Sequence, residues 1–458
     1  MAGIGFELRK ILAKDSLGST VRAYFYAGLI SSGPFILSIL GILLIGLLTT
    51  SLVQPPSDVT QFQVSVTYLM AGSLIVSGGF QLAFTRYISD LIFEKHDEWV
   101  LPSYNAVCLA VTMLSGVLGV ALMFTVFTGQ SLIYRLLMLM GFVILGNIWM
   151  AVIFLASIKQ YRAILLVFAM GYGITVVGSV SLLHYGAEGL LTGFVIGHAI
   201  LLLGANGLIW QNYRSEHYLS GEFFQWRKLY VSLVFVGIFF NLGIWADKFI
   251  FWYSAAGQSV IGPLRASLIY DIPIFLAYLS IIPGMAMFLL RIETDFVDQH
   301  HAFYSAVLGG GSLEDIDAKH AGMVRSAREG LYEILKIQIL VCLLVMVFGE
   351  NLLNALGIST LYMPLLQIDV VAAALQVLFL GTLNIFFYLD RRDIVLWLSG
   401  LFLLLNIVFT VLTLYLGPTS YGLGYAGAML VMVVVSIYSL DRCFAKLQFR
   451  TYMMQAYG

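Results

Sequence analysis

Long blocks of apolar residues recur along the whole chain, and they constrain its fold more than any other feature. Each block approaches the roughly 20 residues with which an α-helix crosses a hydrocarbon core of about 30 Å, at about 1.5 Å rise per residue. Of the 458 residues, 60% are hydrophobic and only 11% are charged. Soluble domains carry about 25% charged residues. The sequence therefore predicts an all-α polytopic membrane protein.

Twelve blocks are long enough to be transmembrane helices, and they fall into two sets of six. We expect two six-helix bundles around a central cavity, at residues 23–210 and 229–440. Residues 1–22 are predicted to form an amphipathic N-terminal segment, residues 211–228 a linker and residues 441–458 a tail. The predicted spans are residues 23–50, 64–88, 102–127, 132–157, 163–183, 189–210, 229–253, 266–290, 334–353, 365–389, 394–416 and 422–440.

The distribution of Lys and Arg predicts the orientation, because these residues are retained on the cytoplasmic side of a membrane. With the N-terminus inside, all of the 24 Lys and Arg residues except Arg135, Lys248 and Arg265 fall on the inner side. We therefore expect a multi-pass membrane protein with both termini in the cytoplasm.

The longest predicted cytoplasmic loop covers residues 291–333. It contains Gly309, Gly310, Gly311 and Ser312 as a break between polar pieces that favour helix. We interpret this loop either as a docking element for a partner or as a solvated connector with helix extensions.

Few ionisable residues lie deep within the predicted spans, where a charge costs about 3 kcal/mol at the helix centre on insertion scales, and we single out five of them. These candidates are Asp247, Lys248, Asp271, Asp369 and Arg135. They gather toward the outer half, where they could line a hydrated vestibule in the substrate pathway. Alternatively, their side chains extend to the interface, an interpretation that we favour for Asp369 and Arg135 because both lie near a helix end.

Helix-breaking residues provide a second signal, since a broken helix in lipid is tolerated only where the freed carbonyls face protein or a cavity. The candidate breaks are Ser31, Ser32 and Pro34 in the first span, Gln81 after Ser77, Gly78 and Gly79 in the second, and Pro273 and Pro283 in the eighth. Small residues can instead allow close helix packing, which we favour for the glycine-rich fifth and sixth spans.

Aromatic residues cluster around Trp245 in the seventh span, at Phe239, Phe240, Phe249, Phe251 and Trp252. Aromatic faces stack on sugar rings, so Trp245 is a candidate substrate contact. The alternative is the ordinary aromatic belt at the membrane interface.

Motifs for enzymatic chemistry are missing from the sequence. It contains no phosphate-binding G-x-x-x-x-G-K-[ST] loop, no nucleophile elbow and no His pair at i, i+4 spacing. We therefore expect no enzymatic activity, no cofactor, no metal and no nucleic-acid partner.

The opening motif MAGIGFELRKIL at residues 1–12, followed by RAYFYAGLISSGPF at residues 22–35, resembles the PelG family. These proteins are inner-membrane transport subunits of bacterial Pel exopolysaccharide systems. The resemblance implies a fold of the flippase and multidrug-exporter superfamily. It also implies an N-acetylgalactosamine-rich polysaccharide substrate, and as partners a PelF-type glycosyltransferase, PelD and PelE.

Three functions are compatible with the sequence. The first is translocation of a nascent polysaccharide, for biofilm matrix secretion. The second is proton- or cation-coupled export of small molecules or lipid-linked sugars, with Asp247, Asp271 or Asp369 titrating. The third is a membrane scaffold that conducts nothing.

Overall fold

A computed structural model describes residue 41 and residues 57–155, 161–226 and 228–453 of the chain. The segment 1–22 and most of the first predicted span, including Ser31, Ser32 and Pro34, lie outside the described residues. Their predicted roles therefore stay predictions.

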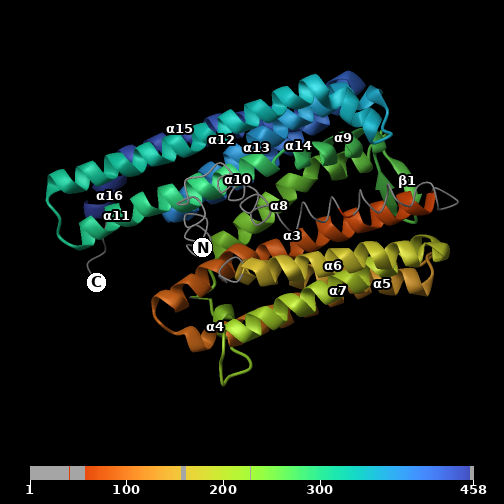
Figure 1. Ribbon diagram of the computed structural model, residues 1–458, viewed down its shortest axis with the longest axis horizontal. Coiled ribbons are helices and arrows are strands. Elements are labelled where there is room, and N and C mark those ends of the chain that lie inside the picture. Colours follow the sequence, from red (N-terminus) through yellow and green to blue (C-terminus); the bar gives the residue numbers. More distant parts are fainter. Residues whose placement is uncertain (1–40, 42–56, 156–160, 227, 454–458) are drawn as a thin grey trace. The chain divides into compact units, whose positions relative to one another are not determined.

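Contacts divide the described chain into two compact units (Figure 1). The first unit ends at Leu268, and the second begins at Ile269. The sequence placed the boundary between bundles at residues 211–228, whereas α8 (Val231–Trp252), which follows that linker, packs along α3 (Ser57–Phe93) within the first unit. The two predicted bundles stay a prediction.

The first unit is built around α3, which contacts α5, α7 and α8, while α6 packs along α7. Its buried aromatic core includes Phe62, Phe84, Tyr104 and Phe154. Its remaining elements are η1 (Asp97–Trp99), α4 (Val100–Thr125), α5 (Leu132–Leu155), α6 (Tyr161–Ser181), η2 (Leu183–Tyr185), α7 (Gly186–Asn212), η3 (Glu222–Phe224), and strands β1 (Gln258–Ile261) and β2 (Leu264–Ala266).

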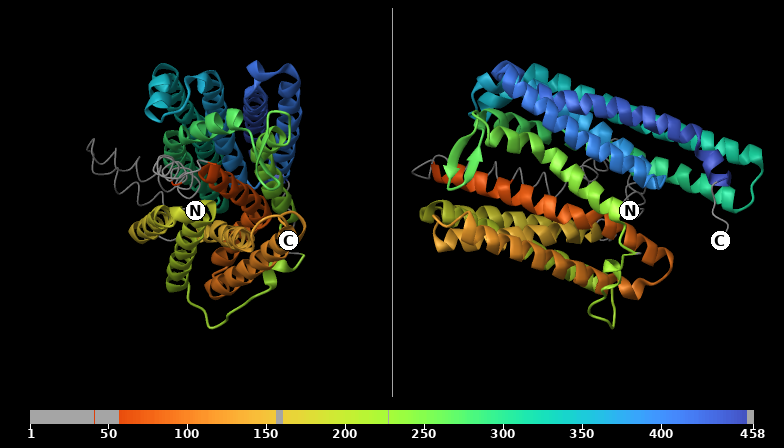
Figure 2. Two further views of the ribbon diagram at one scale, coloured as in Figure 1. Left: turned by 90° about the vertical axis from the view of Figure 1, so that its right-hand side faces the viewer. Right: turned by 180° about the vertical axis from the view of Figure 1, so that it is seen from behind.

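In the second unit, α13 lies at the centre and contacts α10, α12, α14 and α15. Figure 2 shows the second unit's helices α12 to α15 running side by side in two further views. The elements are α9 (Leu268–Leu279), α10 (Ile282–Leu290), the π-helical turn η4 (Arg291–Phe296), α11 (Val297–Leu308), α12 (Leu313–Ala355), η5 (Thr360–Tyr362), α13 (Met363–Tyr388), α14 (Arg392–Leu416), η6 (Pro418–Ser420), α15 (Leu423–Ala445) and α16 (Leu447–Met453).

The described residues contain ten helical stretches that are long and apolar enough to cross a membrane, and a shorter apolar stretch at Leu166–Ser181 within α6. Each predicted span from the second to the twelfth coincides with a described helix, except the eighth, which is divided between α9 and α10. The prediction of an all-α polytopic membrane protein is confirmed. The short antiparallel hairpin of β1 and β2 was not predicted.

Glycines allow close packing of α6 against α7, as predicted for these spans. A Cβ on Gly193 would lie 2.1 Å from the backbone nitrogen of Ser179, and a Cβ on Gly178 would lie 3.2 Å from Gly193 Cα. Side chains at these positions would force the two helices apart.

The predicted interruption of the second span is wrong, because α3 continues without a break from Ser57 to Phe93. The glycines there serve packing: a Cβ on Gly237 of α8 would lie 1.9 Å from the carbonyl oxygen of Gly78. The small residues of α3 thus mark the crossing point with α8.

The polar pieces of residues 291–333 are helical, as predicted, and the break falls in the turn at Gly309–Ser312. In this turn Gly310 has φ +68°, and Gly311 N donates to the carbonyl of Ala306. Ser312 caps the following helix, because its Oγ accepts from Asp315 N at 3.2 Å. α11 and the first half of α12 therefore form a helical hairpin.

Candidate functional site

Asp247 and Lys248 form an ion pair that is buried in the first unit. Lys248 Nζ lies 3.0 Å from Asp247 Oδ2 and donates to the carbonyl of Ile244 at 2.9 Å. Both side chains are 0% exposed. Adjacent residues of a helix point about 100° apart, so Lys248 bends back along α8 to reach both acceptors. The pair keeps two charges inside a predicted span without exposing either of them.

The Trp245 side chain is also buried, 2% exposed, and its ring lies 6.3 Å from that of Trp252. Trp252 stacks on Tyr68 of α3 with ring centroids 4.5 Å apart. These rings pack against one another and hold α8 to α3. Because Trp245 is buried, a sugar could stack on its ring only after a neighbouring group moves.

Gln81 and Arg135 are half-buried residues of the first unit. Gln81 Nε2 donates to Ser77 Oγ at 3.0 Å on the same helix. Arg135 lies in the first turn of α5, and its Nε is buried. Gln81 lies on α3 and Arg135 on α5, whereas the Asp247–Lys248 pair lies on α8.

The second unit buries two further carboxylates. Asp271 lies in the first turn of α9, where the positive end of the helix dipole favours a negative charge. Asp369 of α13 is 0% exposed. A Cβ on Gly422, which has φ +84°, would lie 3.0 Å from Asp369 Oδ1. The loop before α15 therefore passes directly over this carboxylate, and Asp369 does not extend to the interface as we had favoured.

The eighth predicted span is broken, as its prolines indicated. Pro273 lies inside α9, which ends at Leu279, and Pro283 lies in the first turn of α10. Gln338 of α12 lies over the break, with its Nε2 3.5 Å from the carbonyl oxygen of Ser280 and 3.4 Å from that of Ile281. The buried amide thus faces the backbone carbonyls that the break releases.

The sequence interpretation missed a buried carboxylate at Glu293, because it assigned this residue to the loop 291–333. Glu293 is 5% exposed and lies in the π-helical turn η4. Its Oε1 accepts from Asn384 Nδ2 at 2.9 Å and its Oε2 accepts from the Tyr388 hydroxyl at 2.6 Å. Apolar residues Ile292, Phe296 and Val297 around Glu293 in the sequence were the available signal. π-Helical turns often occur at functional sites.

The structure thus groups the candidates by unit. Asp247, Lys248 and Trp245 lie together on α8, whereas Asp271, Pro273 and Pro283 lie along the broken α9–α10 segment. Hydrogen-bonding groups inside apolar units suit a protein that accommodates a polar ligand or ion. Across the described residues, no group of three or more His, Cys, Asp or Glu residues is arranged to hold a metal ion.

The fold is similar to those of several solved transporters. An outward-facing MATE family multidrug resistance transporter of the MOP superfamily matches with a TM-score of 0.64 and 13% identity, over 93% of this chain and 96% of that chain. A MOP superfamily transporter from Pyrococcus furiosus matches with a TM-score of 0.63 and 12% identity, over 92% and 96%. An inward-facing MATE family transporter matches with a TM-score of 0.58 and 14% identity, over 89% of this chain and 95% of that chain. The chain is thus a multi-pass membrane protein with the fold of MATE transporters.

The family is shown by the sequence itself. Residues 1–452 match the family described as "PelG: Putative exopolysaccharide Exporter (EPS-E)", and the chain belongs to this family. The predicted resemblance is therefore confirmed over essentially the whole chain, and the protein is a membrane transporter. A search of curated proteins gave no match.

Proposed function

We propose that this protein translocates a nascent, N-acetylgalactosamine-rich exopolysaccharide from the cytoplasm to the periplasm across the bacterial inner membrane. The observation that carries the proposal is membership of an exopolysaccharide exporter family over residues 1–452, together with a MATE-like fold. The protein moves its cargo without transforming it, so no catalytic residues are assigned.

The chemistry of the cargo is consistent with the polar groups of the two units. An acetylated polysaccharide is uncharged and carries many hydroxyls, so it needs hydrogen-bonding groups more than a strongly charged filter. Asp271 and Asp369 of the second unit, and Gln81 of the first, remain the candidate pathway residues. Asp247 and Lys248 are candidates only if their ion pair opens during transport.

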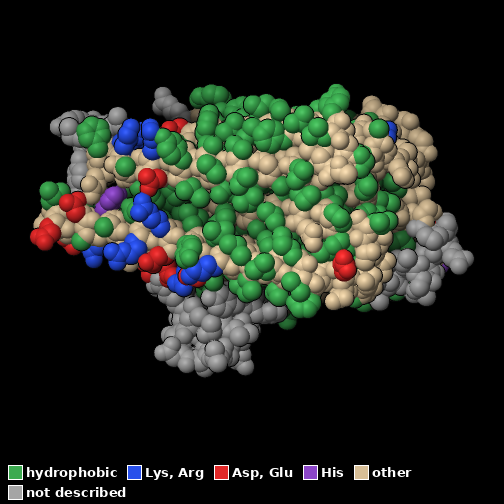
Figure 3. Space-filling view, turned by 90° about the horizontal axis from the view of Figure 1, so that it is seen from above, with side chains coloured by type: hydrophobic (Ala, Val, Ile, Leu, Met, Phe, Trp, Pro, Cys, Tyr) green, Lys and Arg blue, Asp and Glu red, His purple; other side chains and the backbone are tan. Residues whose placement is uncertain are grey.

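The charge distribution supports the proposed orientation. On α12, ionisable residues crowd the first half up to Lys336, and only Glu350 follows. Figure 3 shows most of the Lys, Arg, Asp and Glu side chains of the face it draws gathered at one end, while hydrophobic side chains are spread over its middle. We propose that this charged end, with the α11–α12 hairpin and α16, lies in the cytoplasm.

The α11–α12 hairpin is the proposed docking element for a cytoplasmic PelF-type glycosyltransferase, with PelD and PelE as further partners. At its tip Leu308 is 84% exposed and Leu313 is 71% exposed, on either side of the glycine turn. Exposed apolar patches mark contacts with other proteins or with membranes, and we propose that these two leucines contact the glycosyltransferase. The transferase would then release the growing chain close to the transporter.

Docking is tested by co-purification from detergent. Leu308→Ser with Leu313→Ser should reduce recovery of the glycosyltransferase severalfold, and Leu404→Ser with Val408→Ser, on the exposed side of α14 within its span, is the control. Undiminished recovery with the tip variant would move the docking surface elsewhere.

A coupled exporter is the second candidate, and the observation that favours it is the buried Glu293 with its two neutral hydrogen-bond donors. A buried carboxylate that binds and releases a proton could couple transport to a proton gradient. Transport measured against pH separates the two functions. A coupled exporter should lose its pH dependence in Glu293→Gln or in the Asn variants of Asp247, Asp271 and Asp369, whereas a synthesis-driven translocator should not.

The proposed function is tested in cells that make the glycosyltransferase and its partners with or without this chain. We expect polymer outside the inner membrane only when the chain is present, and cytoplasmic or no polymer without it. Equal amounts of polymer outside the inner membrane in both strains would contradict the proposal.

A further inference from the structure

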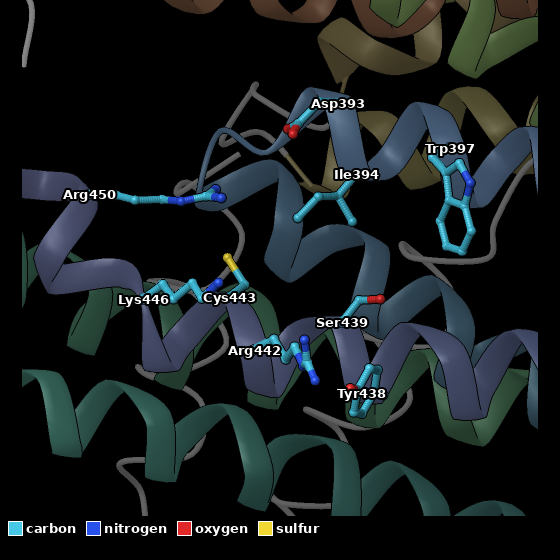
Figure 4. A pocket seen from close by; sticks show the side chains of 9 residues that line it. All are labelled: Asp393, Ile394, Trp397, Tyr438, Ser439, Arg442, Cys443, Lys446 and Arg450. Atoms are coloured by element: carbon cyan, nitrogen blue, oxygen red, sulfur yellow. The ribbon is translucent and has the colours of Figure 1, made fainter. Parts of the chain in front are cut away.

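A groove of about 350 Å³ lies between α14, α15 and α16 of the second unit (Figure 4). Figure 4 shows Lys446 and Arg450 at one end of the groove and Trp397 and Tyr438 at the other. Its lining combines three cations with a single carboxylate, that of Asp393. The groove is therefore basic, and it lies at the end of two helices, α14 and α15, that are otherwise mostly apolar.

The three cations of this groove are Arg442, Lys446 and Arg450, and none of them has an ion pair within the described residues. Arg442 instead lies over the Tyr438 ring, with its Cζ 4.8 Å from the ring centroid. The carboxylate beside Arg442 in the sequence is already occupied, because Asp441 pairs with Arg328 at 2.7 Å. Among the described residues, the groove thus sets three positive charges against the single carboxylate of Asp393.

An exposed apolar surface begins where the cations end. Trp397 and Tyr438 are each 56% exposed, and farther along the same two helices Leu404 is 57% and Val434 is 61% exposed. Exposed Trp and Tyr side chains next to basic residues are typical of the boundary between hydrocarbon and headgroups. Cations beside exposed aromatic and aliphatic side chains match the chemistry of a headgroup joined to its acyl chains.

We propose that this groove binds an anionic phospholipid, with its phosphate among Arg442, Lys446 and Arg450 and its acyl chains along the exposed apolar sides of α14 and α15. Basic pockets between membrane helices recognise such headgroups. The continuity of the cations with the lipid-exposed surface favours a lipid over a soluble anion or an acidic protein segment. This inference does not depend on the identity of the transported cargo.

The test uses the purified full-length chain and native mass spectrometry. Phosphatidylglycerol is titrated against phosphatidylcholine with the same acyl chains, and inorganic phosphate is added as a competitor. We expect the affinity for phosphatidylglycerol to be about tenfold or more higher than that for phosphatidylcholine, because each basic residue adds attraction to an anionic headgroup. Arg442→Gln with Lys446→Gln should abolish this preference.

The matched control is Lys95→Gln with Arg214→Gln, which removes the same charge from exposed positions of the first unit and should keep the preference. Arg450→Gln, on α16, is another variant of the groove and should weaken the binding of phosphatidylglycerol severalfold. Equal loss in the site and control variants would overturn the proposal. Equal binding of both lipids would also overturn it. Displacement of the lipid by millimolar inorganic phosphate would assign the groove to a free anion instead. Site variants that bind phosphatidylglycerol normally but recover less partner protein in co-purification would assign it to a protein contact.

Discussion

The Tyr388 hydroxyl donates a hydrogen bond to Glu293 Oε2 over 2.6 Å, and this contact fastens the C-terminal end of α13 to the π-helical turn that follows α10. Asn384, one turn earlier on α13, donates to the other oxygen of the same carboxylate at 2.9 Å. A single side chain thus joins a central helix of the second unit to the root of the α11–α12 hairpin. Any rearrangement of the hairpin relative to α13 must break or move these bonds.

Glu293→Ala should destabilise the protein more than Glu293→Gln. The alanine variant leaves the half-buried Tyr388 hydroxyl and Asn384 amide without this acceptor, at a cost of up to about 1–3 kcal/mol for each unsatisfied group. Glutamine keeps the size of the side chain and can hydrogen bond to both neighbours. Thermal unfolding in detergent measures the difference, and equal midpoints for the two variants would show that this network does not stabilise the second unit.

Gly284→Ala should destabilise the broken eighth span through Gln338. A Cβ at residue 284 would lie 1.9 Å from Gln338 Nε2, so the amide must leave the carbonyls of Ser280 and Ile281. We expect a cost of about 1–3 kcal/mol, as for other overpacked sites.

The same substitution should cost much less in a Gln338→Ala background, because the clash is already removed. Gly116→Ala on α4 is the control, since a Cβ there meets nothing within 4 Å. Additive effects of Gly284→Ala and Gln338→Ala on the unfolding midpoint would show that the two residues are independent.

Gly237→Ala should separate α8 from α3. Its Cβ would lie 1.9 Å from the carbonyl oxygen of Gly78, which cannot move aside as a side chain can. We expect a loss of folded protein, or a destabilisation at or above the roughly 1–3 kcal/mol typical of overpacking. Gly173→Ala on α6, where a Cβ meets nothing within 4 Å, should behave like the wild type. Gel-filtration yield and unfolding midpoint distinguish the two, and a wild-type profile for Gly237→Ala would contradict this helix crossing.

Lys248→Met should be more harmful than the double variant Asp247→Asn with Lys248→Met. Removing one member of a buried ion pair costs about 3–5 kcal/mol, whereas replacing both by neutral side chains is often tolerated. Unfolding midpoints of the single and double variants test this. If the destabilisation of the double variant equals the sum of those of Asp247→Asn and Lys248→Met, the 3.0 Å contact contributes no coupling energy.

The helices could be predicted from the sequence because the bilayer requires long apolar segments with internally satisfied backbones. The break at Pro283 was predictable for the same reason, since proline cannot donate its helical hydrogen bond. The polar, helical nature of residues 291–333 and the turn at Gly309–Ser312 also followed from composition.

The partners of individual side chains could not be predicted, because they depend on which helices meet. A glycine such as Gly78 can either allow a bend in α3 or allow α8 to pack closely against it, and the sequence looks the same in both cases. Only the contact with Gly237 distinguishes these two roles. Glu293 was hidden because a carboxylate near the end of a span is usually solvated, whereas here the π-helical turn directs it toward Asn384 and Tyr388. The hairpin of β1 and β2 was missed because strands of three and four residues leave no periodic pattern.

The most direct test of polysaccharide translocation is reconstitution of the purified chain in vesicles with its glycosyltransferase outside and a radiolabelled nucleotide-activated N-acetylgalactosamine as donor. The account predicts that labelled polymer accumulates in the lumen, protected from an added glycoside hydrolase until detergent opens the vesicles. Polymer that is made in full but stays entirely open to the hydrolase would contradict it.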